Sequence, residues 1–131
     1  MDIASWSARM LSVLRIVTGL LFLEHGTQKL LGFPPPVNPG PALFSLLGLQ
    51  GILELVGGAL IVIGLFTRPV AFVLAGDMAV AYFYAHAQRG FFPTLNMGQL
   101  AILFCFVFFY LFVAGGGAWS VDQQRAASRS R

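Results

Sequence analysis

Long apolar stretches alternate along the chain with short segments rich in proline, glycine or polar residues. A bilayer core of about 30 Å requires about 20 apolar residues in a helix. Stretches that approach this length cover residues 10–31, 46–66, 69–87 and 97–114. None of them shows the apolar–polar alternation of a membrane β-strand. The pattern therefore predicts an all-α membrane protein, a single domain over residues 1–131 in which a four-transmembrane-helix bundle precedes a tail over residues 115–131.

The segments between these stretches have the composition of loops. Residues 32–41 read GFPPPVNPGP, and successive prolines cannot continue a helix because they lack the N–H donor. Pro69 follows a short break and suits the first turn of a helix. Residues 88–96 contain a further glycine and proline, and a run of glycines over 115–117 ends the last stretch.

The composition requires lipid as the solvent. Apolar residues make up 57% of the chain and charged residues only 10%, whereas a soluble domain carries roughly 25% charged residues. The basic residues are scattered, which argues against nucleic-acid binding. The single cysteine, Cys105, excludes an internal disulfide and a dithiol redox mechanism, and we interpret it as a packing residue.

The placement of basic residues predicts the orientation. With four spans, both termini and the second loop share one side of the membrane. That side holds six of the eight basic residues, and the other side holds Lys29 and Arg89. The positive-inside rule then predicts cytoplasmic termini in a multi-pass protein of the bacterial inner (plasma) membrane. Arg15 and Arg68 fall at the cytoplasmic end, where their side chains are expected to extend to water.

Polar side chains inside these stretches predict a shared interior. A charged group in a membrane helix costs at least about 2.5 kcal/mol, so it usually faces the bundle. At about 100° per residue, each helix carries one polar face. The aligned positions are Arg15, Thr18, Gly19, Phe22, Gly26 and Lys29 with His25 at the margin; Gly51, Glu54, Gly57, Gly58 and Ile61; Asp77, Ala81, Tyr84 and Gln88, with His86 pointing elsewhere; and Gln99, Leu103, Phe106 and Tyr110.

These faces predict a polar pocket that opens toward the outer half of the membrane. Its proposed catalytic residues are His25, Lys29 and Glu54. Its proposed ligand-binding residues are His86, Asn96, Gln99, Asp77 and Tyr84.

Several chemistries remain open for this set. Lys29 and Glu54 could form a structural ion pair, and Asp77 could pair with Arg15 or Tyr84. His25 and His86 are possible axial haem ligands, but no metal-ligand spacing is present. A proton relay or quinol-binding role is also open, because histidine titrates near neutral pH.

Four segments together resemble the DoxX family of small four-helix membrane proteins. They are RIVTGLLFLEHGTQKLLGF (15–33), GILELVGGALIVIGLFTRPVAF (51–72), MAVAYFYAHAQRGFFPTLN (78–96) and FYLFVAGGGAWSVD (109–122). The resemblance implies a family named from a subunit of an archaeal quinol oxidase, with relatives in thiosulfate:quinone oxidoreduction and in oxidative-stress systems.

The family motif carries over onto many positions of this chain and departs at two. The matching positions are Arg15, His25, Gly26, Lys29, Glu54, Gly57, Gly58, Arg68, His86, Asn96 and Asp122. Gln99 is an amide where relatives have a carboxylate, which weakens any proton-transfer role there. Asp77 stands where relatives often have glutamate.

The sequence thus favours a quinone-linked oxidoreductase subunit or accessory protein. In this hypothesis, the pocket holds a quinone head group, and His25, Lys29 and Glu54 bind its oxygens and shuttle protons. One alternative is a non-catalytic scaffold or assembly factor that recruits redox protein partners. Another is a small transporter, which at this size would need to form a homo-oligomer.

Overall fold

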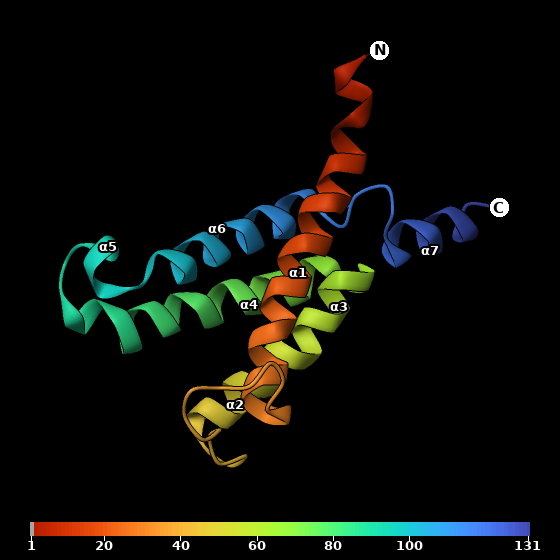
Figure 1. The fold of residues 1–131 in the computed structure, drawn as a ribbon. Helices are drawn as coiled ribbons and strands as arrows, with labels where there is room; N and C mark the ends of the chain where they lie inside the picture. Colours follow the sequence, from red (N-terminus) through yellow and green to blue (C-terminus); the bar gives the residue numbers. More distant parts are fainter. Residues whose placement is uncertain (1) are drawn as a thin grey trace.

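The computed structural model describes residues 2–131, and every regular element in that range is a helix (Figure 1). The chain makes four long helical segments, two of which contain a π-helical turn, and a short C-terminal helix follows them. The elements are η1 (Ile3–Trp6), α1 (Ser7–Leu31), α2 (Leu46–Ile52), η2 (Leu53–Gly57), α3 (Gly58–Ile63), α4 (Thr67–Ala81), η3 (Tyr82–His86), η4 (Ala87–Arg89), α5 (Pro93–Asn96), α6 (Gln99–Ala114) and α7 (Val121–Arg129).

Local sequence explains where these helices begin and end. Gly32 and Gly64 adopt left-handed conformations, with φ of 67° and 71°, and end α1 and α3. Glycine takes this conformation without the steric cost of a Cβ atom. The Ser45 hydroxyl accepts a hydrogen bond from the Gly48 N–H at 3.0 Å and so caps α2.

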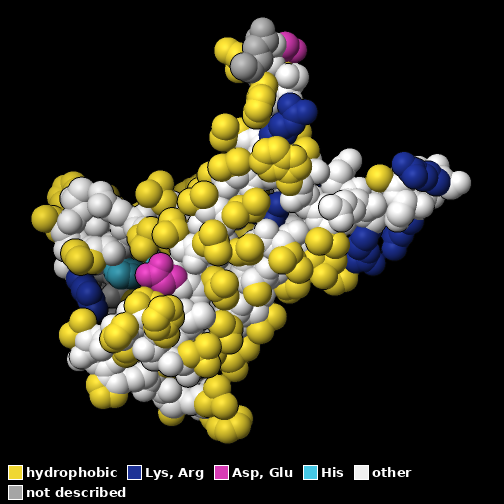
Figure 2. Space-filling view, turned by 45° about the vertical axis from the view of Figure 1, so that its right-hand side comes forward, with side chains coloured by type: hydrophobic (Ala, Val, Ile, Leu, Met, Phe, Trp, Pro, Cys, Tyr) yellow, Lys and Arg dark blue, Asp and Glu magenta, His cyan; other side chains and the backbone are white. Residues whose placement is uncertain are grey.

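Three helical stretches are long and apolar enough to cross a membrane. They are Ile3–Leu31, Leu46–Ile63 and Thr67–Arg89. The predicted fourth span is shorter, because the turn at Met97 and Gly98 separates α5 from the 16-residue α6. Hydrophobic side chains cover most of the face drawn in Figure 2, and Lys and Arg gather at its projecting ends. An apolar outer surface is what a lipid environment favours.

Two helix pairs make up the bundle. α1 runs along α2, η2 and α3, whereas α4 runs along α6, and the pairs cross in Figure 1. Glycines allow the first pair to approach closely. A Cβ at Gly26 would lie 2.5 Å from the Leu55 nitrogen, and one at Gly58 would lie 2.9 Å from the Leu23 Cα. Only residues without a side chain permit this backbone separation.

Aromatic packing joins the two pairs. The Phe22 ring of α1 lies 5.3 Å from the Phe104 ring and 4.9 Å from the Phe108 ring of α6, centroid to centroid, in edge-to-face arrangements. Ile61 and Leu74 are fully buried beside them. The predicted interior faces of the first two helices are confirmed, since Thr18, Gly19, Phe22 and Gly26 and then Gly51, Glu54, Gly57, Gly58 and Ile61 are all buried.

The predicted interior face of α6 is wrong. Leu103, Phe106 and Tyr110 are each more than half exposed, whereas Phe104, Phe108 and Leu111 are buried. α6 is apolar on all of its sides, so its sequence carries no amphipathic pattern that could predict which face is buried.

The prediction that Arg15 extends to water is also wrong, because its side chain is completely buried. Its guanidinium donates to the carbonyl oxygens of Gly116 at 2.7 Å, Ile61 at 2.6 Å and Trp119 at 2.7 Å, and also to that of Val62. The charge is satisfied by backbone oxygens exposed where α3 and α6 end, so neither water nor Asp77 is needed as its partner.

Candidate functional site

A cavity of about 320 Å³ lies where α1, η2, η3 and α6 meet. One side of its wall is apolar and partly aromatic, from Phe22, Met78, Met97, Leu100 and Phe104. The polar side chains in the wall are His25, Lys29, Gln50, Glu54 and His86. An apolar wall with a few converging polar groups is typical of a small-molecule site.

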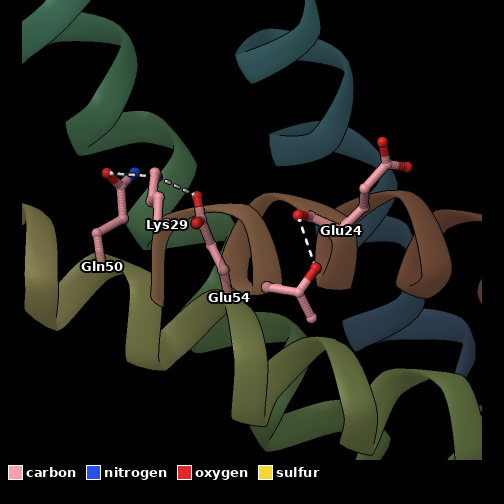
Figure 3. A network of polar contacts seen from close by, with 5 residues as sticks. Glu24, Lys29, Gln50 and Glu54 are labelled. Atoms are coloured by element: carbon pink, nitrogen blue, oxygen red, sulfur yellow. Dashed lines mark hydrogen bonds and ion pairs between the residues drawn. The ribbon is translucent and has the colours of Figure 1, made fainter. Parts of the chain in front are cut away.

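Lys29 connects the two helices of the first pair through polar contacts (Figure 3). Its ammonium donates to Glu54 Oε1 at 2.8 Å and to Gln50 Oε1 at 3.2 Å. Lys29 has three N–H donors, so one remains available to a ligand in the cavity. Glu24 points away from this network in Figure 3 and is exposed, whereas Glu54 is buried beside Lys29.

Glu54 keeps one oxygen free beside the cavity. Its side chain is only 4% exposed, yet Oε2 has no hydrogen-bond partner in the part of the chain that the structure describes. Glu54 lies in the π-helical turn η2, and such turns frequently occur at functional sites. A buried carboxylate oxygen without a partner is costly, and a ligand that donates a hydrogen bond would satisfy it.

His86 lies in the second π-helical turn, η3, and its ring is held from one side. Its Nδ1 lies 3.1 Å from the Asn96 carbonyl oxygen. Because a carbonyl oxygen only accepts, Nδ1 carries the proton, and Nε2 of the neutral ring is then an acceptor. The sequence predicts His86 to lie off the polar face of its own helix and yet among the ligand-binding residues of the pocket, and its side chain lines the cavity. The π-helical turn shifts the regular helical register, so a residue off the predicted face reaches the cavity.

His25 also lines the cavity and is half-buried, with its ring 6.1 Å from the Phe104 ring in an edge-to-face arrangement. In Figure 2, a histidine and an acidic side chain lie side by side on a mostly hydrophobic face, near a basic side chain. These ionisable side chains thus lie close together on a face whose side chains are mostly apolar.

The structure separates the remaining predicted site residues from this cavity. Asn96 is completely buried and has a structural role, since its amide donates to the Gly90 carbonyl at 2.9 Å and its Oδ1 accepts from the Gly98 N–H at 2.9 Å. Gln99 is exposed. Asp77 and Tyr84 line a different, neighbouring cavity.

Comparison with known proteins identifies the family of this chain. The model of the family described as DoxX matches residues 10–87. A Haemophilus influenzae protein named "Uncharacterized protein" is 42% identical over 119 residues, covering 87% of this chain and 89% of the relative. This chain belongs to the DoxX family.

Two more distant relatives carry names that describe them further. A Mycobacterium tuberculosis protein named "Uncharacterized membrane protein Rv3486" is 28% identical over 85% of this chain and 78% of its own length. A Bacillus subtilis protein named "Putative oxidoreductase CatD" is 33% identical over 70% of each chain. No solved structure matches this chain significantly. The family and the apolar helices together identify a membrane protein.

The motif residues of this DoxX protein divide into groups with different structural roles. His25, Lys29, Glu54 and His86 line the cavity, whereas Gly26 and Gly58 allow the close approach of α1 and α3. Arg15, Arg68 and Asp122 lie at the other end of the bundle and bond to backbone. Arg68 donates to the Phe112 carbonyl at 3.1 Å and to that of Val113.

Asp122 of the DoxX chain caps a helix that is distant in sequence. Its two oxygens accept from the N–H groups of Phe66 and Thr67, each at 2.8 Å, at the start of α4. Partial burial raises the pKa of Asp122, but hydrogen bonds from Thr67 and Phe66 and the charge of Arg125 outweigh this and hold the pKa below its ordinary value. Asp122 is therefore a structural carboxylate.

Sequence reasoning missed Gln50 and the apolar wall of the cavity. Gln50 precedes Glu54 by one helical turn and contacts the same ammonium. This i, i+4 spacing is the signal that could have found it. Phe22 already stood on the predicted inward face of its helix, but Met78 and Phe104 have no such signal, because apolar residues in a membrane helix are too common to single out.

Proposed function

We propose that this protein is a quinone-linked subunit of a membrane redox system and that the cavity of about 320 Å³ binds the quinone head group. The observation that carries the proposal is the meeting of the Lys29–Glu54 pair and two histidines against an aromatic wall. A quinone presents the matching chemistry, with a flat apolar ring and two oxygens at opposite edges. The volume lies near the lower end of ligand pockets, which favours a single ring over the larger haem macrocycle.

The residues of the chain supply hydrogen bonds and proton acceptors. Lys29 can donate its free N–H to a quinone oxygen, and Glu54 Oε2 can accept from a quinol hydroxyl. The ring nitrogens of His25 and His86 can donate or accept a hydrogen bond at the head group. A bound quinone accepts two electrons and two protons, and the electrons would come from a redox protein partner, since Cys105 is the sole thiol.

We further propose that the protein lies in the bacterial inner membrane with both termini in the cytoplasm. The excess of basic residues on the terminal side supports this orientation. With this orientation, the cavity lies in the outer half of the membrane. The name of the Bacillus subtilis relative supports the link to oxidoreduction.

The test is binding of decylubiquinone to the full chain in nanodiscs, measured by equilibrium dialysis and mass spectrometry. We expect the protein to retain more quinone than empty nanodiscs do. His25→Ala and Lys29→Met should each weaken binding by about tenfold, as expected for the loss of one hydrogen bond worth about 1.4 kcal/mol. Glu24→Gln, which removes an exposed carboxylate of the same helix, is the matched control and should bind as the unaltered chain does.

The result that would overturn the proposal is equal retention of quinone by empty nanodiscs, or unchanged binding by His25→Ala. In that case, proteins that co-purify with the chain would be examined for the scaffold role. A phenotype lost on removing residues 121–131, but kept in the Lys29→Met variant, would support that role.

A further inference from the structure

A second cavity, of about 280 Å³, lies between α2 and the α4–η3 segment. It is lined mainly by leucine, valine and alanine side chains. Its rim is open to the apolar outside of the molecule, because Leu46, Leu49, Val80 and Tyr84 are each more than half exposed. A ligand would therefore reach this cavity from the lipid, and most of its body must be apolar.

One charged group lines this cavity. Asp77 is the single ionisable side chain of the wall besides the Tyr84 phenol. Asp77 Oδ2 is buried, and it has no hydrogen-bond partner within residues 2–131. An unpartnered carboxylate oxygen in an apolar wall is costly unless a proton or a cation satisfies it.

The neighbouring cations have other partners. Lys29 is the basic residue of the adjacent cavity, and its ammonium bonds to Glu54 and Gln50. Arg15, the remaining buried cation, bonds to carbonyl oxygens at the terminal end of the bundle. Lys29 is thus already paired with Glu54, and no cation of residues 2–131 forms a salt bridge with Asp77.

We propose that this second cavity binds amphiphilic ammonium compounds, with Asp77 as the counter-ion. An ammonium N–H donates to Asp77 Oδ2, and the apolar part of the molecule packs against the leucine and valine side chains of α2 and α4. The Tyr84 ring at the rim suits a nearby cation through its π face. This binding site adjoins the proposed quinone site, and Gln50, Ala81 and Ala85 line both cavities, but the inference does not depend on that proposal.

The experiment measures binding of phenethylammonium to the full chain in nanodiscs by equilibrium dialysis, with empty nanodiscs as the baseline. The neutral probe 2-phenylethanol has the same apolar body and a hydrogen-bond donor but no charge. We expect the ammonium to bind above the baseline, and Asp77→Asn to weaken it by about tenfold or more, because charge-assisted hydrogen bonds are the stronger class. The alcohol should show no such dependence on Asp77. Glu24→Gln removes an exposed carboxylate elsewhere and is the matched control for charge.

A second variant tests the cavity without touching its charge. Gly76 lines the cavity, and a Cβ built there meets nothing within 4 Å. Gly76→Leu should therefore fold, occupy the cavity and abolish ammonium binding. The proposal is overturned if phenethylammonium binds no better than to empty nanodiscs, or if either Asp77→Asn or Gly76→Leu binds it as the unaltered chain does. It is also overturned if the alcohol loses affinity with Asp77→Asn as strongly as the ammonium does.

Discussion

Arg15 and Lys29 are cations of the same helix, and their surroundings give them opposite roles. Arg15 is fully enclosed, and all of its named contacts are backbone carbonyls from α3 and from the segment after α6. The Lys29 side chain is 27% exposed and has a free donor beside a cavity. A ligand therefore finds no free donor at Arg15, whereas Lys29 offers one.

We predict that Arg15→Lys destabilises the protein by about 2 kcal/mol or more, because an ammonium cannot reproduce the planar set of donors and leaves buried carbonyls unpaired. Thermal unfolding in detergent measures this effect. Arg9→Lys is the control, since Arg9 is exposed and its guanidinium lies over the Trp6 ring, 5.0 Å from the ring centroid. Equal melting temperatures for Arg15→Lys and the unaltered chain would contradict the structural role.

At the scale of elements, glycines set the distance between α1 and its partner helix. A Cβ at Gly26 would overlap the backbone of Leu55 and lie 2.9 Å from the Glu54 carbonyl carbon. The spacing that places Glu54 beside Lys29 therefore depends on the absence of a side chain at Gly26.

We predict that Gly26→Ala costs about 1–3 kcal/mol of stability, the usual range for overpacking, and weakens ligand binding at Lys29 as the helices separate. Gly76→Ala provides the matched control, because Gly76 faces open space within a helix and alanine is the better helix former. Melting temperatures of both variants measure the difference. A Gly26→Ala protein as stable as Gly76→Ala would exclude this close approach.

The cap that Asp122 supplies to α4 makes stability depend on pH. The pKa of Asp122 is held below its ordinary value in the folded state, so the unfolded chain binds a proton more readily and stability falls as pH falls. We predict that Asp122→Asn costs about 1 kcal/mol at pH 6, a typical value for a cap. Unfolding measured from pH 6 to pH 3 should show this stability difference narrowing as the pH falls through and below the ordinary aspartate pKa of about 3.9, where the unfolded chain takes up a proton first. A difference independent of pH would mean that charge contributes nothing to the cap.

At the scale of the whole molecule, the two ends of the chain and the connection between α3 and α4 meet at one end of the bundle. The Ala118 N–H donates to the Ala8 carbonyl at 3.0 Å, and the Asp122 N–H donates to that of Gly64 at 2.9 Å. Four crossings would produce this arrangement, because both termini and the second connection would then lie on the same side of the membrane.

We predict that an alkaline phosphatase fused after Arg131 is inactive and a fluorescent protein there is fluorescent, as expected for a cytoplasmic terminus. The same phosphatase inserted in the proline-rich segment 34–41 should be active. Activities normalised to protein amount provide the measurement. An active phosphatase at the C-terminus would reverse the proposed orientation and place the cavity in the inner half of the membrane.

The amino-acid sequence was enough to predict the helical class, the approximate positions of the long helices and the inward faces of the first two. These follow from composition and from the spacing of polar residues and glycines on a helix of known period. The same spacing grouped His25, Lys29 and Glu54, which line one cavity in the structure. Family resemblance added further positions but could not separate ligand-facing residues from those that bond to backbone.

Tertiary structure alone decided the rest, because the deciding contacts join residues far apart in the chain. The enclosure of Arg15 depends on carbonyls about one hundred residues away, and Asp122 caps a helix that begins 55 residues earlier. The π-helical turn at His86 breaks the regular period from which the inward face of that helix is predicted. The buried side of a uniformly apolar helix such as α6 is set by how it packs against its neighbours. The spacing of apolar residues in its sequence therefore cannot predict that side.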